Sequence, residues 1–401
     1  MQLAIIIAEY DPFHRGHMAL VRAVRAAGAT HVAAIMSGSF LQRGAAACFS
    51  KWARTRQALA GGVDLVAELP VPWAVSGAET FARGGVALAD ALGADMLAFG
   101  SECGSADQLQ RAAEVLLCPE FGSRLRRLMK DGTPFAVARE AAVTALAGAD
   151  TAALLRTPNN ILGIEYCKAM KIQQSRMQPF TICRQGAEHG SMSESSIPSA
   201  SRIRTLVQSH GNWADALPEG SAAVVRRELQ AGRAPASLDR LERAVLYRLR
   251  TMSRAEYASL PDLSEGLENR IFKAAQRACS LEELFRLTKT RRYSLARLHR
   301  VVLSAFLGLR AADSTDYPPY LHILGFGPGG RQVLACAAGK GALPLLTHTS
   351  DKQRLDSTGQ NVLSLERRAT NIWALCCPRP CPAGLDETAG ILVLEKGECC
   401  T

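Results

Sequence analysis

Positions 3–17 of the chain read LAIIIAEYDPFHRGH, and the expected architecture follows from this stretch. Residues 3–8 form a short, wholly apolar run rich in isoleucine, which is typical of a strand buried in a parallel sheet. After a polar segment, apolar residues recur at helical spacing between 18 and 24, and the pattern ends at Gly28. A second apolar run follows at 31–36. This strand–helix–strand unit predicts an α/β fold with a doubly wound, Rossmann-like parallel sheet.

The same alternation continues through the first half of the chain. It predicts further strands at 65–67, 96–100 and 180–183, and helices at 51–60, 77–92, 105–117, 134–147 and 161–170. After about residue 200 the strands stop, and helical periodicity prevails at 221–231, 237–252, 264–277, 280–287 and 294–311. The tail is rich in Gly, Pro and Cys and offers only one helix, at 361–375, and one strand, at 391–394.

Charge divides the chain more sharply than composition does. The protein carries a formal net charge of +10, and residues 201–312 alone hold 20 Lys and Arg against 11 Asp and Glu. A local cationic excess of this size favours an anionic partner, with nucleic acid first. We therefore predict an α/β domain over 1–205, a helical, basic domain over 206–330, and a C-terminal region of uncertain fold over 331–401.

Composition excludes several classes of protein. With 48% hydrophobic and 21% charged residues, the 401-residue chain has an ordinary globular composition. No apolar run approaches the ~20 residues that a membrane span needs, so no membrane partner is expected. Residues 1–8 are too short for a secretory signal and lack its basic start. We expect a cytoplasmic protein.

The 12 cysteines do not form a recognisable disulfide framework. Cys376, Cys377 and Cys381 form one C-C-x3-C cluster, but only the distant tail pair, 399–400, is available as a second half-site. A structural zinc site needs two such pairs at suitable spacing. We therefore predict reduced thiols and no metal site.

Two histidines lie where the first strand gives way to the first helix. His14 and His17 are three residues apart, so both imidazoles lie on one face of that helix. A helix N-terminus presents free N–H groups and a positive dipole end, and Gly16 allows a nucleotide to approach the backbone. Donors placed there stabilise charge on a phosphoryl group during displacement. His14 and His17 are the candidate catalytic residues.

A second element supports a phosphate site. Residues 199–204 read SASRIR after a proline and open a helix, so the hydroxyls of Ser199 and Ser201 can cap it and Arg204 can reach the β- and γ-phosphates. The alternative is an ordinary N-cap without a ligand. The pairing of H-x-G-H near the start with S-x-[ST]-x-I-R near the end of the domain resembles the HIGH-type nucleotidyltransferases, which split ATP between its α- and β-phosphates.

The opening EYDPFHRGH resembles, more closely, the E-Y-N-P-F-H-x-G-H of the bacterial tRNA(Met) cytidine acetate ligases. Further blocks agree in order up to about residue 330. They are MSGSFLQRG (36–44), KWART (51–55), GVDLV (62–66), ELP (68–70), FGSE (99–102), PNNILGIEY (158–166), EGLENR (265–270) and RYSLAR (292–297).

The resemblance implies an ATP-dependent acetate ligase. Such an enzyme forms acetyl-adenylate, releases pyrophosphate, and acetylates the exocyclic amine of the wobble cytidine of elongator tRNA(Met) to N4-acetylcytidine. The implied requirements are ATP with Mg²⁺, acetate and that tRNA. The ATP site implied by the resemblance, besides Ser201 and Arg204, comprises Ile7, Ala8, Glu9, Tyr10, Asp11, Pro12, Phe13, His14, Arg15, Gly16, His17, Leu20, Gly100, Asn159 and Arg184.

Two points of this site stay open. Asn159 and Asn160 both follow Pro158, and either amide can hydrogen-bond adenine or ribose; we choose Asn159. Asp11 stands where the family has Asn. An added carboxylate repels triphosphate unless Mg²⁺ or Arg15 offsets its charge, so it either holds metal or weakens ATP binding.

The RNA contact is expected between Arg286 and Arg300, where no acidic residue occurs. Basic groups there neutralise phosphates and the interleaved aromatic rings stack on unpaired bases, unless Tyr293 packs into a core instead. The predicted tRNA-binding residues are Lys289, Arg291, Arg292, Tyr293, Arg297 and Arg300. The alternatives are a nucleotidyltransferase acting on a small phosphorylated metabolite, which leaves the basic segment unexplained, and a non-catalytic RNA-binding protein with a relic nucleotide site.

Overall fold

The computed structural model describes residues 1–130, 133–184, 198–264, 266–290, 292–314 and 316–395. Its centre is an eight-stranded sheet with the order β10-β8-β5-β2-β1-β6-β7 and β9 paired to β8. The strands are β1 (Leu3–Ala8), β2 (His31–Ser37), β5 (Leu65–Leu69), β6 (Met96–Ser101), β7 (Gln178–Cys183), β8 (Leu321–Phe326), β9 (Leu345–Leu346) and β10 (Leu392–Val393). The pairs β5-β2, β2-β1, β1-β6 and β6-β7 are all parallel, so the predicted fold class is confirmed.

Strand β1 is buried on both faces, which explains its uniformly apolar sequence. Leu3, Ile5 and Ile7 pack into one hydrophobic core, and Ala4 and Ile6 pack into the core on the opposite face. A strand covered by helices on both sides has no solvent-facing position, so polar alternation is absent.

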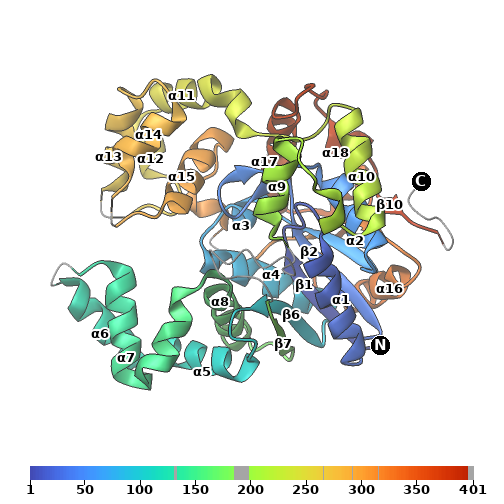
Figure 1. Ribbon diagram of the computed structural model, residues 1–401, viewed down its shortest axis with the longest axis horizontal. Helices are drawn as coiled ribbons and strands as arrows, with labels where there is room; N and C mark the ends of the chain where they lie inside the picture. The colour runs from blue at the N-terminus through green and yellow to red at the C-terminus, as the bar shows by residue number, and fades with distance from the viewer. Residues whose placement is uncertain (131–132, 185–197, 265, 291, 315, 396–401) are drawn as a thin grey trace.

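Helices cover both faces of the sheet (Figure 1). In this part of the chain they are α1 (Arg15–Ala26), α2 (Lys51–Ala60), α3 (Val71–Ala74), α4 (Ala78–Leu92), α5 (Ala106–Leu117), α6 (Pro119–Lys130), α7 (Phe135–Ala153) and α8 (Pro158–Ile172), with a small hairpin of β3 (Phe40–Leu41) and β4 (Ala45–Ala46). α7 is kinked at Gly148, and α6 is a helix that sequence patterning did not predict.

A second group of helices follows the sheet strands. It comprises α9 (Ala200–Gln208), α10 (Glu219–Gln230), α11 (Glu242–Thr251), α12 (Arg254–Ala258), α13 (Leu267–Ala275), α14 (Leu281–Thr288) and α15 (Leu295–Leu307). Helices α11 to α15 enclose a hydrophobic core of their own, which includes Leu249, Ile271 and Val301. The prediction of a largely helical segment holds for this part of the chain.

The expectation that strands stop after about residue 200 was wrong for β8 and β9, whereas the strand expected at 391–394 is present as β10. β8 lies beside β5 in the main sheet and runs antiparallel to it, and β9 and β10 pair with β8. The tail also contributes α16 (Gly330–Lys340), α17 (Ser357–Leu375) and α18 (Leu385–Thr388). Residues 321–326, assigned above to the helical domain, therefore complete the sheet. No element was predicted for this short apolar segment, because the strand that it pairs with lies far away in the chain.

The order of the strands reverses beside β1. From β1 the chain moves to β2 and β5 on one side, whereas β6 and β7 lie on the other. Loops that leave the carboxyl ends of β1 and β6 therefore diverge, and open α/β sheets bind ligands at such a point.

Candidate active site at the switch point of the sheet

His14 and His17 lie together at the start of α1, directly after β1. His14 is the N-cap of the helix, and its ring stacks on that of His17 with ring centroids 3.7 Å apart and an interplanar angle of 24°. His14 is only 4% exposed. The predicted pairing of two imidazoles at one helix N-terminus is thus present in the fold.

Backbone hydrogen bonds set the tautomer of both rings. The Gly16 N–H donates to His14 Nδ1 at 3.0 Å, and the His14 N–H donates to His17 Nδ1 at 3.2 Å. A neutral imidazole that accepts at Nδ1 carries its proton at Nε2. Each ring therefore presents an Nε2–H donor, and that of His14 is buried without a partner among the described residues.

Both rings are neutral at pH 7. Burial, reinforced by the charges of Arg184 and Arg204, lowers the pKa of His14 to about 4. Burial, followed by the influence of His14 and Arg184, lowers the pKa of His17 well below its ordinary value. A desolvated neutral donor at a helix N-terminus suits an anion whose charge grows during a reaction.

Aromatic packing holds His17 in place. The ring of Tyr10 meets it edge-on at a centroid distance of 4.9 Å, and that of Phe13 lies at 5.6 Å. Tyr10 and Phe13 are at most 1% exposed. A Cβ added at Gly61 would lie 2.2 Å from Phe13, so that glycine makes room for the ring. Tyr10 and Phe13 thus form the wall behind the histidines.

Arg184 and Gly100 meet at the ends of neighbouring strands. Arg184 follows β7 directly, and its backbone N–H donates to Ser101 O at 2.9 Å. A Cβ added at Gly100 would lie 3.0 Å from Arg184 Cγ, so a larger residue at the end of β6 would displace the arginine. The exposed guanidinium contributes to the lowered histidine pKa values, which places its charge on the same site.

The two asparagines at the start of α8 have different partners. Asn160 is buried, and its Oδ1 accepts from the backbone N–H groups of Glu102 and Cys103 at 3.0 and 3.1 Å. Asn159 is half-buried, and its Oδ1 accepts from Arg184 Nη1 at 3.4 Å. Asn160 is therefore occupied within the protein, and Asn159 is the amide that faces the arginine.

Glu102 is a residue of this site that the sequence did not single out. Its carboxylate accepts from Asn159 Nδ2 at 2.7 Å and from the Asn160 N–H at 2.7 Å. Burial acts to raise the pKa of Glu102, but these hydrogen bonds outweigh it and the pKa is lowered. Glu102 is the last residue of the FGSE block that resembles the family. This match was the signal in the sequence that could have identified Glu102 as a site residue.

Arg204 reaches the first loop from α9. Its Nη1 donates to Asp11 O at 2.7 Å, and its charge contributes to the lowered pKa of His14. Ser199, not Ser201, is the N-cap of α9, and Ser201 is exposed with its carbonyl bonded to Thr205. Arg204 therefore reaches the loop that precedes α1, whereas the hydrogen bond described for Ser201 lies within its own helix.

Asp11 is occupied by the backbone. Its side chain is buried, with Oδ2 accepting from the Cys48 N–H at 2.9 Å and Oδ1 from the Phe49 N–H at 3.2 Å. Arg204 lies 3.9 Å from the same carboxylate and offsets its charge. Both oxygens are turned toward residues 48–49, so the carboxylate supports the loop and is not placed to hold a metal.

The remaining predicted ATP residues fall into two groups. The side chains of Ile7 and Leu20 lie in the cores on either side of the sheet, so only their backbone can face a ligand. The side chain of Arg15 turns away and its Nε donates to Asp215 O at 2.7 Å, so it does not offset Asp11 as expected. Glu9 accepts from the Gln42 N–H at 3.0 Å. Ala8, Pro12 and Gly16 supply backbone to the loop and the helix start.

Arg54 is a second residue that the analysis of the sequence missed. It is fully buried, and its guanidinium donates to the backbone carbonyls of Glu9, Ser37, Gly38 and Phe49. One cation thereby holds the loops that leave β1 and β2. Arg54 lies in the KWART block (51–55), and nothing in the local sequence predicts its structural role.

The predicted RNA-binding residues are only partly available. Tyr293 is 5% exposed and lies in the core of α11 to α15, so its ring is not placed to stack on a base. Arg300 donates twice to Asp262 Oδ2, at 2.9 and 2.6 Å, and Arg297 donates to Asp262 O at 2.8 Å. Base stacking by Tyr293 is therefore not supported, whereas Arg297 and Arg300 are bonded within the protein and their RNA contact stays a prediction.

Two of the predicted RNA-binding residues are exposed. Lys289 donates from Nζ to Tyr293 O at 2.7 Å while remaining exposed, and Arg292 is exposed as well. Arg291 lies outside the described residues. The exposed residues Lys289 and Arg292 remain candidates for phosphate contacts.

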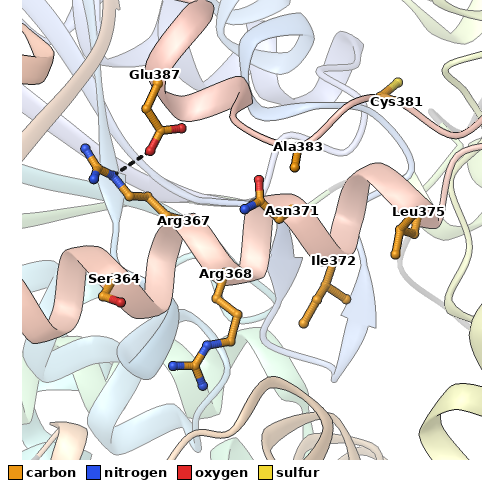
Figure 2. A pocket seen from close by; sticks show the side chains of 9 residues that line it. All are labelled: Ser364, Arg367, Arg368, Asn371, Ile372, Leu375, Cys381, Ala383 and Glu387. Atoms are coloured by element: carbon orange, nitrogen blue, oxygen red, sulfur yellow. Dashed lines mark ion pairs between the residues drawn. The ribbon is translucent and has the colours of Figure 1, made fainter.

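A groove along α17 is a second candidate for a binding site. Its volume is about 560 Å³, and Figure 2 shows Arg367 reaching across it to Glu387, 3.1 Å away. Arg368 donates to Leu307 O, and Asn371 accepts from the Gly384 N–H. Because these polar groups are already paired within the protein, we interpret the groove as a boundary between packed segments and not as a ligand site.

Neither metal ligation nor thiol chemistry is indicated. Within the described ranges no cluster of His, Cys, Asp and Glu could hold a metal ion. The cysteines that the structure describes are free thiols. Burial, with a contribution from Asp11, raises the pKa of the Cys48 thiol, which removes it as a nucleophile near the site. No helix of the described chain is both long and apolar enough to cross a membrane.

Comparison with known proteins agrees with this geometry. Residues 1–387 match the family described as HIGH Nucleotidyl Transferase. A tRNA(Met) cytidine acetate ligase of Alkaliphilus metalliredigens is 35% identical over 399 residues, which cover 94% of each chain. That of Syntrophomonas wolfei is 37% identical over 411 residues, covering 97% of this chain and 98% of the relative.

Solved structures agree as well. The crystal structure of Thermotoga maritima TmcAL bound with alpha-thio ATP is 30% identical, covers 99% of this chain and 100% of its own, and gives a TM-score of 0.92. Its apo form gives 0.93. The agreement includes the tail, which sequence inspection matched poorly.

Paired histidines at the mouth of α1, on a sheet that reverses its strand order beside them, define a HIGH-type nucleotidyltransferase. Within that class, the chain belongs to the tRNA(Met) cytidine acetate ligase family.

Proposed function

We propose that this protein uses ATP to activate acetate as acetyl-adenylate and then acetylates the wobble cytidine of elongator tRNA(Met) to N4-acetylcytidine. The observation that carries the proposal is the pair of neutral, stacked imidazoles whose Nε2–H groups lie at the start of α1. Membership of the tRNA(Met) cytidine acetate ligase family supports the choice of acetate and tRNA.

The first step is a displacement at phosphorus. An acetate oxygen attacks the α-phosphorus of ATP, the bond from that phosphorus to the bridging oxygen breaks, and pyrophosphate leaves. His14 and His17 donate from Nε2 to phosphate oxygens as charge builds on them. Arg184 and Arg204 supply positive charge to the same triphosphate, and their electrostatic influence on His14 supports that placement.

The second step needs positioning rather than a covalent enzyme intermediate. The cytidine amine attacks the acetyl carbon, AMP leaves with the electrons of the broken C–O bond, and the amine proton passes to solvent. Acetyl-adenylate is already an activated acyl donor, so the protein must align the amine and exclude water. The buried, unreactive Cys48 thiol is consistent with direct transfer.

Mg²⁺ fits this site as a companion of the triphosphate. The carboxylates of Glu9, Asp11 and Glu102 all accept hydrogen bonds from the protein. Mg²⁺ commonly binds through substrate phosphates and retained waters, which requires no protein cage. We infer that the ion arrives with ATP, where it would neutralise the pyrophosphate leaving group.

The decisive assay supplies ATP, labelled acetate and total tRNA to the purified protein and identifies the labelled nucleoside. The expected product is N4-acetylcytidine in elongator tRNA(Met), with AMP and pyrophosphate formed. Pyrophosphate exchange that requires a phosphorylated metabolite instead of acetate would replace the proposal with a small-molecule nucleotidyltransferase. No ATP turnover with acetate and tRNA present would favour a relic nucleotide site.

A further inference from the structure

Helix α6 carries four exposed cations on one face. Arg124, Arg126, Arg127 and Lys130 are all exposed, and at 100° per residue they occupy a single arc of the helix. The only acidic residue in α6 is Glu120 in its first turn. Among the residues that the structure describes, none of the four cations forms an ion pair with a carboxylate. Arg126 makes one long hydrogen bond, to Ser123 at 3.5 Å.

Two acidic residues of the adjacent helices form ion pairs elsewhere. Glu114 of α5 pairs with Lys171, and Glu140 of α7 pairs with Arg156. Charges of opposite sign on a surface are usually interspersed, so a helix that keeps four like charges without partners is unusual. Since no carboxylate among the described residues pairs with these four cations, an external anion can bind them.

The opposite face of α6 is already covered. Phe121 is buried, and Leu125 and Leu128 pack against the main hydrophobic core. A basic amphipathic helix that binds lipid must insert its apolar face into the membrane. Because α5 and α7 cover that face in α6, only the cationic face is available, and a soluble polyanion fits it better than a bilayer.

Two exposed apolar residues lie just beyond α6, at the start of α7. Phe135 is 53% exposed and Val137 57% exposed, and the guanidinium carbon of Arg139 lies 5.6 Å from the centre of the Phe135 ring. An exposed aromatic ring beside arginine offers a flat face to a base or sugar. Phe135 begins α7, five residues after Lys130, the last cation of α6.

The base of this surface lies at the catalytic edge of the sheet. Helices α5 to α7 form an arm inserted between Glu102 and Asn159, and these two residues hydrogen-bond to each other at 2.7 Å. Asn159 in turn contacts Arg184. Figure 1 shows the arm and helices α11 to α15 projecting from the same side of the sheet. A long substrate held at the histidines could therefore extend over both.

We propose that the cationic face of α6, with Phe135, is a second RNA-binding surface that contacts the phosphate backbone of the tRNA outside the loop being acetylated. This inference rests on the proposed function for the identity of its ligand. Each arginine neutralises a phosphate, while Phe135 packs against an exposed base or ribose. The arm would thereby hold the tRNA while the target cytidine enters the site.

The test removes two charges from the arm in the full-length protein. The variant Arg124→Ala/Arg127→Ala should bind elongator tRNA(Met) about tenfold more weakly at 0.1 M salt. The slope of the logarithm of the association constant against log salt should become less negative by about 2. Acetate-dependent ATP–pyrophosphate exchange, measured without tRNA, should be unchanged. Phe135→Ala should weaken tRNA binding about fivefold with no change in the salt slope.

The matched control is Arg226→Ala/Arg331→Ala, which removes the same charge from α10 and α16, away from the arm in Figure 1. Its tRNA affinity and salt slope should stay within about twofold of the wild type. Because the substituted side chains are exposed, the arm variant should denature at the same temperature as the wild type. An unchanged midpoint shows that the variant is folded.

The possible failures can be told apart. Wild-type protein without acetate-dependent exchange would sink the proposed function itself. Normal exchange in the wild type, together with an arm variant that binds tRNA as well as the control does, would overturn the arm proposal alone. The arm proposal would also be overturned if the arm variant kept its tRNA affinity but no longer bound anionic phospholipid vesicles.

Discussion

The start of α1 and the α11–α15 bundle are both rich in potential anion ligands, but folding treats them differently. His14 and His17 accept backbone hydrogen bonds at Nδ1, and His14 Nε2 has no partner among the described residues. In the bundle, Arg297 and Arg300 are both bound to Asp262, which is remote in sequence. The backbone of a local motif orients the side chains of that motif. A net positive charge over a long segment does not show which of its cations are available to bind an external anion.

The largest effect is expected for His14→Asn. Asparagine is a good N-cap, so its Oδ1 can still accept from the Gly16 N–H while the Nε2–H donor is lost. Acetate-dependent ATP–pyrophosphate exchange should fall about 10²- to 10³-fold in kcat/KM, as for loss of one transition-state donor. Near wild-type exchange in a variant with normal thermal stability would remove His14 from the chemistry.

Arg184→Met tests the charge that reaches the site from β7. A charge-assisted contact to phosphate is worth about 1.5–3 kcal/mol, so the KM for ATP should rise about 10- to 100-fold. Arg22→Met removes an exposed arginine from the far side of α1 and serves as the control. Equal KM values for the two variants would place Arg184 outside the nucleotide site.

Asp11→Asn separates support of the loop from ATP binding. The amide can accept from only one of the two backbone N–H groups that the carboxylate now satisfies, those of Cys48 and Phe49. Denaturant unfolding should show a loss of about 1–3 kcal/mol, with the KM for ATP within about twofold of the wild type. A large change in KM without loss of stability would return Asp11 to the phosphate site.

The smallest effects should distinguish the two arginines of the bundle. Arg292→Ala should weaken tRNA binding about two- to fourfold and change stability by no more than about 0.5 kcal/mol, because the side chain is exposed. Arg300→Ala should lower stability by about 1–3 kcal/mol through the loss of its bonds to Asp262, with a smaller change in tRNA affinity. The reverse pattern would restore Arg300 to the RNA surface and weaken the comparison.

Sequence patterning reached most of the sheet because each parallel strand is locally apolar and each helix locally periodic. β1, β2, β6 and β7 lie where they were expected. β8 escaped because its partner, β5, is more than 250 residues away in the chain, and nothing local in 321–326 records that pairing. α6 escaped because it follows α5 after a single residue, Cys118.

The site was predictable where its residues are adjacent in sequence and less so where they meet in space. His14 and His17 needed only their spacing, and the family resemblance supplied Gly100, Asn159 and Arg184. Glu102 and Arg54 act through partners far along the chain, and no local pattern announces such contacts. Tyr293 illustrates the converse, since an aromatic residue among basic residues proved to be core.

Histidine protonation tests the central claim, because protonated rings would place N–H groups against the backbone donors of Gly16 and His14. The folded-state pKa of His14 is about 4, against 6.5 unperturbed. Its stabilising contribution is therefore complete above pH 6.5 and is lost as the pH falls through about 4.

The most direct measurement is ¹⁵N NMR of histidine-labelled protein between pH 5 and 8, with and without ATP. The account predicts that both rings stay neutral as Nε2–H tautomers throughout this range and that their Nε2 signals shift when ATP binds. Titration of either ring near pH 6.5, or Nε2 signals indifferent to saturating ATP, would contradict it.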